Sequence, residues 1–167
     1  IRRILGRNWI ETLGPELRLG DDIAVDVLEV RRALAEGDLE GVLERARGRF
    51  LAGWYLRDTT GFEEWVDDVR RNVLFLRRNA CRTLIDRALE AGDHEAVVRA
   101  ARLWLDSEPT REEAHLALTR ALLALGRPST AVEACELYAD RLGAALGAVV
   151  ERPGGLRALR GPPRRCR

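Results

Sequence analysis

The residues of this chain that could act as nucleophiles or metal ligands are few and widely separated. The three cysteines, Cys81, Cys135 and Cys166, form no CxxC pair, and the two histidines, His94 and His115, stand apart from each other. Nucleophilic catalysis needs a thiol or hydroxyl beside a base, and a structural zinc site needs closely spaced ligands. Neither pattern occurs, so we expect no enzyme activity, no metal site, no cofactor and no disulfide framework.

Carboxylates are abundant, but their spacing does not suit acid–base chemistry. Adjacent pairs occur at Asp21 and Asp22, Glu63 and Glu64, Asp67 and Asp68, and Glu112 and Glu113. Neighbouring residues on a helix do not face each other, so such pairs are typical of solvated faces and of first helical turns. No glycine-rich phosphate loop is present. The formal net charge of +1 indicates that any contact with nucleic acid is local.

The overall composition is that of a globular protein that does not cross a membrane. Hydrophobic residues make up 46% of the chain and charged residues 33%. No apolar run approaches the roughly 20 residues that span a bilayer, and no signal-peptide pattern is visible. We therefore expect a cytoplasmic protein with no membrane contact.

The N-terminal part predicts a small β-hairpin followed by two helices. Residues 9–12 and 17–19 are short extended candidates, with Gly14 and Pro15 as the turn between them. Two strands alone are marginally stable in water, so the hairpin is expected to pack against something else. Asp26 and Glu29 have the spacing that caps a helix, which we expect to end near Gly37. Asp38 is expected to cap the next helix.

The rest of the chain predicts longer helices that form a repeat. Thr60 and Glu63 are spaced as a capping box before a helical pattern over residues 61–91, which Gly92 ends. Gly126 follows Gly92 by 34 residues, and Pro109 lies between them. The same offset joins Leu84 to Leu118, Leu89 to Leu123, Leu103 to Leu137, and Trp104 to Tyr138. A 34-residue helix–turn–helix period is the tetratricopeptide pattern. We predict a mainly α fold of tetratricopeptide-like antiparallel helical hairpins with a short N-terminal β-hairpin.

Two expectations about side chains follow from this pattern. The matched residues Leu89, Leu103, Leu123 and Leu137 should be buried between the stacked helices. An aromatic cluster surrounds the start of the long helix and consists of Phe50, Trp54, Tyr55, Phe62 and Trp65. It is either a core clasp between the preceding loop and the helix or an exposed anchor for a partner, since tryptophan and tyrosine dominate binding hot spots.

Several segments in a fixed order resemble the bacterial transcriptional activator domain. They are FLAGW at 50–54, FEEW at 62–65, AGDHEAVVRAARLWLDSEPTREEAH at 91–115 and YADRLGAALG at 138–147. The family is a tetratricopeptide-like domain found beside the DNA-binding domain of regulators of the antibiotic regulatory protein type. The resemblance implies a transcription activator whose helical part contacts RNA polymerase, another protein or a second protomer.

The first residues resemble the end of a winged helix of the response-regulator type. By this resemblance residues 9–19 form the wing, and Arg2, Arg3 and Arg7 lie at or just past the end of the recognition helix. These arginines and Arg18 are candidates for contact with DNA phosphates. By the same resemblance, we expect this chain to lack most of the recognition helix, and Glu16 in the wing would repel phosphate. We therefore expect DNA binding through the full-length winged helix, and weak or no binding by this chain alone.

The expected organisation has three parts. Residues 1–22 are the winged-helix remnant, 23–150 the activator domain and 151–167 a flexible tail. The candidate partner surface consists of Trp54, Tyr55, Arg70, Arg71, Arg77 and Arg78. The alternative function is a tetratricopeptide-like interaction scaffold without DNA binding, and a helix-turn-helix encoded upstream of Ile1 would distinguish the two.

Overall fold

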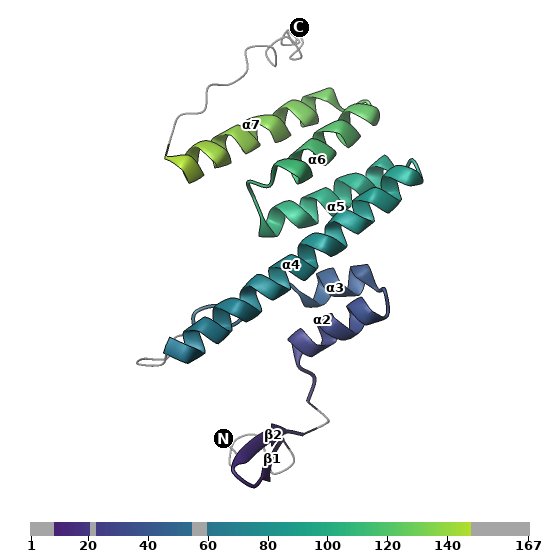
Figure 1. Ribbon diagram of the computed structural model, residues 1–167. Coiled ribbons are helices and arrows are strands. Elements are labelled where there is room, and N and C mark those ends of the chain that lie inside the picture. The colour runs from purple at the N-terminus through teal and green to yellow at the C-terminus, as the bar shows by residue number, and fades with distance from the viewer. Residues whose placement is uncertain (1–8, 21–22, 55–59, 148–167) are drawn as a thin grey trace, which may run out of the picture. The chain divides into compact units, whose positions relative to one another are not determined.

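The computed structural model describes residues 9–20, 23–54 and 60–147, which form six helices and one two-stranded sheet (Figure 1). The helices are α2 (Asp26–Ala35), α3 (Leu39–Arg45), α4 (Thr60–Glu90), α5 (His94–Ser107), α6 (Glu112–Ala124) and α7 (Pro128–Leu146). The chain divides into two compact units, Ile1–Arg47 and Gly48–Arg167. The predicted mainly α fold with a short N-terminal hairpin is confirmed. The predicted tail, 151–167, lies outside the described residues.

The hairpin consists of β1 (Ile10–Leu13) and β2 (Glu16–Leu19), which pair antiparallel with Ile10 opposite Leu19. Gly14 has a φ of +62° in the turn, a conformation that glycine adopts without the steric cost of a side chain. The register places Ile10, Leu17 and Leu19 on one face, and both leucines are exposed. One face of the hairpin is therefore apolar and uncovered among the described residues.

The two short helices of the first unit differ in how they begin. At α3 the Asp38 carboxylate accepts a hydrogen bond from the Gly41 amide at 2.9 Å, which confirms the predicted cap. At α2 the prediction that Asp26 is the cap is wrong, because Val25 occupies that position in an extended conformation without a side-chain cap bond. Asp26 is the first helical residue, and its carboxylate accepts from the Val27 amide at 2.7 Å. An acidic residue there still interacts favourably with the helix dipole.

In the second unit, α4, α5, α6 and α7 form a stack in which each helix packs on the next in chain order. Gly92 and Gly126, at equivalent turns, both have a φ of +69°. In each turn the glycine amide bonds to the carbonyl three residues earlier, at 3.1 and 3.0 Å. The next amide bonds to the carbonyl five residues before it, at 2.9 and 2.8 Å. These matching turns confirm the helical repeat that the 34-residue spacing predicted.

The prediction that the four matched leucines are buried is wrong. Leu89, Leu103, Leu123 and Leu137 are 50%, 40%, 48% and 48% exposed. Successive residues on a helix are turned by about 100°, so the residue beside a leucine can face the core while the leucine faces outward. The buried equivalents at the 34-residue offset are Ala80 and Ala114, Cys81 and His115, Ala88 and Leu122, Val97 and Ala131, and Val98 and Val132. The core of this stack is thus built mainly from small side chains, which let the helices approach closely.

Candidate partner-binding surface

The loop that precedes α4 is fastened to that helix by the guanidinium group of Arg70. Its Nε donates to the carbonyl of Phe50 at 2.9 Å, and its Nη2 donates to the carbonyl of Leu51 at 3.0 Å. The remaining nitrogen, Nη1, bonds to the carboxylate of Asp67 on the same helix at 3.0 Å. The planar fork of arginine suits two neighbouring carbonyl oxygens, so this side chain sets where the loop lies on α4.

Aromatic rings reinforce this attachment. The Phe50 ring meets Trp65 edge-on, with ring centroids 5.7 Å apart, and Phe62 lies 5.7 Å from the same indole. The predicted clasp between loop and helix is therefore present for these three rings. Trp65 is nevertheless half exposed, because Phe50 and Phe62 cover only part of it.

The described part of the loop presents Trp54 to solvent from a strained turn. Leu51 has a φ of +46°, a left-handed conformation that costs a bulky residue roughly 1–2 kcal/mol. Its carbonyl accepts a second hydrogen bond, from the Trp54 amide at 3.1 Å, in addition to that from Arg70. The Trp54 side chain is 63% exposed. Strain that is maintained by surrounding bonds is a reason to look for function at such a turn. Tyr55, which was also predicted for this surface, lies outside the described residues.

Arg71 is the most exposed of the four arginines predicted for the partner surface. Its guanidinium group pairs with Asp68 one turn earlier on α4, and both side chains are largely exposed. An exposed pair of this kind contributes little to stability. Arg71 can therefore exchange its carboxylate for one on another molecule at low cost.

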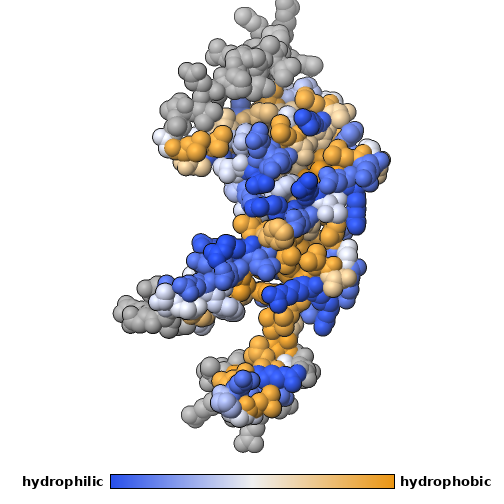
Figure 2. Space-filling view, in the orientation of Figure 1, coloured by the Kyte–Doolittle hydropathy of each residue, from blue (hydrophilic) through white to orange (hydrophobic). Residues whose placement is uncertain are grey.

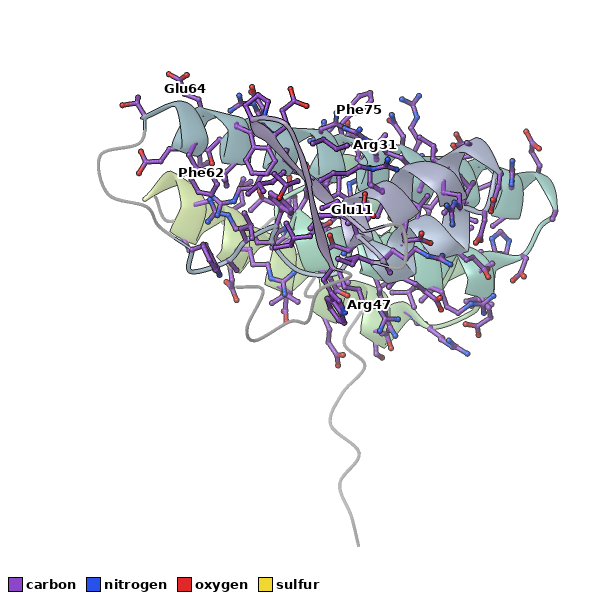
Figure 3. The ribbon with its side chains drawn as sticks, turned by 90° about the horizontal axis from the view of Figure 1, so that it is seen from below. Glu11, Arg31, Arg47, Phe62, Glu64 and Phe75 are labelled. Carbon is purple, nitrogen blue, oxygen red and sulfur yellow. The ribbon has the colours of Figure 1, made fainter. Side chains whose placement is uncertain are left out.

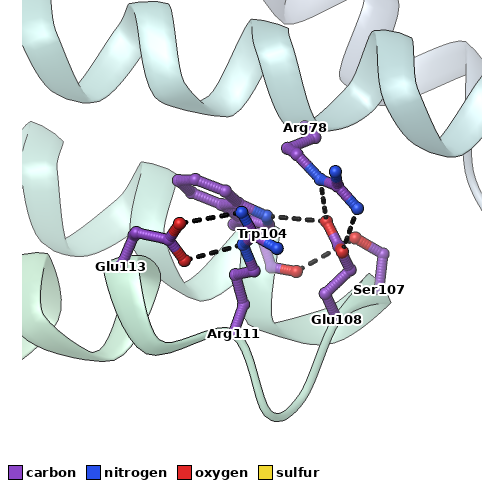
Figure 4. A network of polar contacts seen from close by, with 6 residues as sticks. All are labelled: Arg78, Trp104, Ser107, Glu108, Arg111 and Glu113. Carbon is purple, nitrogen blue, oxygen red and sulfur yellow. Dashed lines mark hydrogen bonds and ion pairs between the residues drawn. The ribbon is translucent and has the colours of Figure 1, made fainter.

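Arg77 and Arg78 have contacts that join α4 to α5. Arg77 is buried and donates from Nη2 to the Leu103 carbonyl at 2.9 Å. Arg78 forms a two-pronged ion pair with Glu108, with Nε at 2.9 Å from Oε2 and Nη2 at 2.6 Å from Oε1 (Figure 4). Trp104 on α5 donates its indole N–H to the same Oε2 at 2.9 Å. Both guanidinium groups thus bond within the protein.

The Glu108 carboxylate is the centre of this network, and sequence reasoning missed it. Burial disfavours its charged form, but the hydrogen bonds from Arg78 and Trp104 outweigh burial and lower the pKa of Glu108. The same hydrogen bond raises the pKa of Arg78 against the opposing effect of burial. Arg111 lies over the Trp104 ring, 6.0 Å from its centroid, and pairs with Glu113 (Figure 4). Only folding brings Arg78 and Glu108 together, since 30 residues separate them.

Of the four predicted phosphate-binding arginines, the structure describes Arg18 alone. It lies on the exposed strand β2, opposite Glu11 in the hairpin register. Arg2, Arg3 and Arg7 lie outside the described residues. Their contact with DNA stays a prediction.

The buried thiol and imidazole groups have structural surroundings. Burial raises the pKa of Cys81 to about 11, so its thiol stays protonated and is a poor nucleophile. His115 is buried, and its ring centroid lies 4.3 Å from that of Tyr138, with the two rings tilted. Its Nε2 lies 3.0 Å from the Pro109 carbonyl oxygen. Burial lowers the pKa of His115, and that hydrogen bond partly opposes the effect. Within the described ranges, no group of His, Cys, Asp and Glu has an arrangement that could hold a metal.

Comparison with known proteins identifies one family. The sequence model of the bacterial transcriptional activator domain matches residues 24–161, which is most of the chain. No curated protein and no solved structure matches the chain. In the described part of the chain, no helix is both long enough and apolar enough to cross a membrane.

Proposed function

The chain belongs to the bacterial transcriptional activator domain family, and on this premise we propose that it is the partner-binding part of a DNA-binding transcription activator. The observation that carries the proposal is the family match over the helical stack. Stacked helical repeats expose extended surfaces whose usual use is to hold another protein. In this proposal the stack contacts RNA polymerase, another protein or a second protomer, and it performs no catalysis.

The loop before α4 and the adjoining helix face are the proposed partner surface. Trp54 supplies a large exposed apolar side chain, and Arg71 supplies a charge that is free to change partners. Such aromatic and arginine side chains carry most of the binding energy in typical interfaces. Arg70 acts by fixing the loop, while Arg77 and Arg78 act by fixing α5 against α4. Tyr55 completes the proposed surface.

The proposed contact with DNA belongs to the N-terminal segment. We propose that the hairpin is the wing of a winged helix and that Arg18, with Arg2, Arg3 and Arg7, neutralises phosphates. The uncovered face that holds Leu17 and Leu19 supports this, because a two-stranded hairpin is stable only when its apolar face packs on something else. DNA affinity should therefore be high only when the complete winged helix is present.

The test compares this chain with a longer version that carries the upstream helices of a winged domain. DNA binding is measured by fluorescence anisotropy over a salt series, and RNA polymerase binding by biolayer interferometry with purified bacterial holoenzyme. The proposal predicts a steep decrease in DNA affinity with salt for the longer version alone. It also predicts polymerase binding by both versions, weakened by Trp54→Ala and by Arg71→Ala. Absence of DNA binding by the longer version would refute the transcription-factor function.

The second candidate function is an interaction scaffold without DNA contact. It is favoured by one observation: the family match begins at residue 24, after the hairpin. If the longer version binds a protein partner through the helical stack but shows no salt-dependent DNA affinity, the scaffold function replaces the activator function.

A further inference from the structure

Five exposed residues on α4 are spaced seven positions apart along the helix. They are Gly61, Asp68, Phe75, Arg82 and Leu89, and we call them the heptad row. Seven residues correspond to nearly two turns of an α-helix, so all five positions lie along one side of α4. Phe75 is 55% exposed and Leu89 is 50% exposed. A spacing of seven is the one by which two helices pair along their length.

The heptad row lies on a different side of α4 from the aromatic contacts of the loop. Figure 3 shows Phe75 on the same side of α4 as Glu64 and on the opposite side from Phe62. Hydrophilic side chains gather over the first half of α4 (Figure 2), so the exposed phenyl ring at the middle of the helix borders a polar surface. No other ring contacts Phe75 within the described residues. Covering this ring is favourable because it removes apolar area from water.

The two charged members of the heptad row lie at equal distances from Phe75, with Asp68 seven residues before it and Arg82 seven residues after it. Asp68 pairs through Oδ1 with Arg71 on its own helix, and both side chains are largely exposed. Its other oxygen, Oδ2, can accept from a second guanidinium group. Arg82 has no ion pair or hydrogen bond within the described part of the chain. Both charges are therefore available to another molecule.

This arrangement is complementary to a second copy of itself. If two copies of α4 lie antiparallel with a two-fold axis at Phe75, residues at equal distances from Phe75 face each other. Asp68 then faces Arg82 of the second copy, and the symmetry produces this pair twice. At the two ends, Leu89 faces Gly61 of the second copy, where an added Cβ would meet no atom within 4 Å. The two Phe75 rings meet at the axis.

We propose that two copies of the chain associate through the heptad row, with their α4 helices antiparallel. The symmetry of the charges about an apolar centre carries the proposal, because opposite charges across an interface favour one partner and fix its register. The inference deepens the proposed function, on which it rests, since it names a second copy of the chain as a partner of the helical stack. A single pair of helices makes a small interface, so the dimer should be weak.

One contact in this pairing is unfavourable. Glu64 and Asp86 lie eleven residues on either side of Phe75, so Glu64 faces Asp86 of the second copy. Like charges that face each other across an interface weaken it. The change Glu64→Gln should therefore strengthen the dimer, by roughly 2-fold for each of the two symmetry-related contacts. An unchanged or weaker dimer in this variant would contradict the proposed register.

The test is analytical ultracentrifugation of the full chain up to a concentration of about 1 mM. Phe75→Ser should weaken the dimer by about 10-fold, because it removes the apolar centre from both copies. Asp68→Arg should weaken it by about 10-fold as well, because two attractive pairs become two repulsive ones. Arg82→Asp should have the same effect for the same reason. Circular dichroism checks that each variant keeps the helical content of the wild type.

A mixture of the two charge variants is the decisive measurement. In a complex of Asp68→Arg with Arg82→Asp, every facing pair again has opposite charges, so the mixture should associate although neither variant does so alone. The matched controls are Glu63→Arg and Arg87→Asp, each an exposed residue five positions from its counterpart and turned by about 140° around α4. Both controls should dimerise as the wild type does. No association in the mixture, or equal weakening by the controls, would overturn the proposal.

Parallel measurements distinguish the inference from the proposed function. If the wild type remains monomeric at every concentration but binds purified RNA polymerase, the inference fails and the activator function stands. If the dimer forms as described but the longer version binds neither polymerase nor DNA, the heptad row stands and the activator function fails. Polymerase binding by a monomeric wild type that Phe75→Ser and Arg82→Asp both abolish would assign the row to that partner and overturn the proposal.

Discussion

Replacing Glu108 by glutamine should destabilise the helical stack because it changes one carboxylate oxygen, Oε1. Oε2 accepts two hydrogen bonds, from Arg78 Nε and Trp104 Nε1, whereas Oε1 accepts one, from Arg78 Nη2. In Glu108→Gln, the amide oxygen will take the place of Oε2. The amide NH2 group then takes the place of Oε1 and faces the Nη2 N–H of Arg78. The variant therefore loses one charge-assisted bond at 2.6 Å and the charge itself.

The size of the effect follows from the burial of the pair. A hydrogen bond to a charged group contributes about 1.5–3 kcal/mol, and the Arg78 side chain is 32% exposed, so the lower half of that range applies. For a domain of this size, ~2 kcal/mol corresponds to a decrease in melting temperature of about 4–8 °C. The matched control is Glu113→Gln, which removes the ion pair of a carboxylate that is 60% exposed. Glu113→Gln should lower the free energy of unfolding by less than about 1 kcal/mol.

Urea unfolding followed by circular dichroism, repeated from pH 7 down to pH 3.5, is the assay. The folded-state pKa of Glu108 is lowered, so its contribution is fully present above the ordinary carboxyl value of 4.5 and is lost as pH falls through the folded-state pKa. The difference between wild type and Glu108→Gln should therefore be constant near neutral pH and shrink below about pH 4.5. A difference at pH 7 no larger than that of Glu113→Gln would refute the reasoning, as would a difference that stays unchanged in acid.

Three further predictions concern the core. Leu122→Ala should lower the free energy of unfolding in urea by about 2–5 kcal/mol, because Leu122 is buried. Leu123→Ala, one residue along, should lower it by less than about 0.5 kcal/mol. Similar losses for the two variants would contradict the observed burial. Iodoacetamide at pH 8 should label Cys81 at least ~100-fold more slowly in the folded protein than in urea, since burial raises the pKa of Cys81 to about 11. Mass spectrometry of the Cys81 peptide measures the labelling rate, and fast labelling would show an open core. The wild type should lose stability as pH falls below about 6.5, because burial lowers the folded-state pKa of His115 and protons therefore bind preferentially to the unfolded chain. His115→Gln should remove this loss. Equal profiles of unfolding free energy against pH from 7.5 to 5.5 for the two proteins would contradict the reasoning.

Local signals in the sequence predicted the elements of this fold well. The hairpin turn at Gly14, the cap at Asp38 and the left-handed glycines at Gly92 and Gly126 all depend on the backbone preferences of one residue and its neighbours. The cap at Asp26 was misplaced by one residue, because Val25 entered the extended conformation that precedes the helix. Errors of this size are ordinary at helix ends.

The candidate surface could be predicted only in part. The aromatic cluster was visible as a group of side chains close in sequence, yet folding left Trp54 and Trp65 exposed and packed Phe50 and Phe62 against Trp65 alone of these two. Periodicity placed Arg77 on α4, but its bond to the Leu103 carbonyl depends on how α5 crosses that helix. The same holds for Arg78 and Glu108.

The sequence by itself determined the helical repeat, the positions of its turns and the family to which the chain belongs, because each depends on residue types at fixed spacing. Tertiary structure alone decided whether the matched leucines or the residues next to them face water. Helices that pack through alanines approach closely, and this approach buries Ala88 and Leu122 while turning Leu89 and Leu123 outward. Tertiary structure likewise decided which arginines remain available to a partner, since a guanidinium group that meets a buried carbonyl or carboxylate across helices is no longer free to leave it.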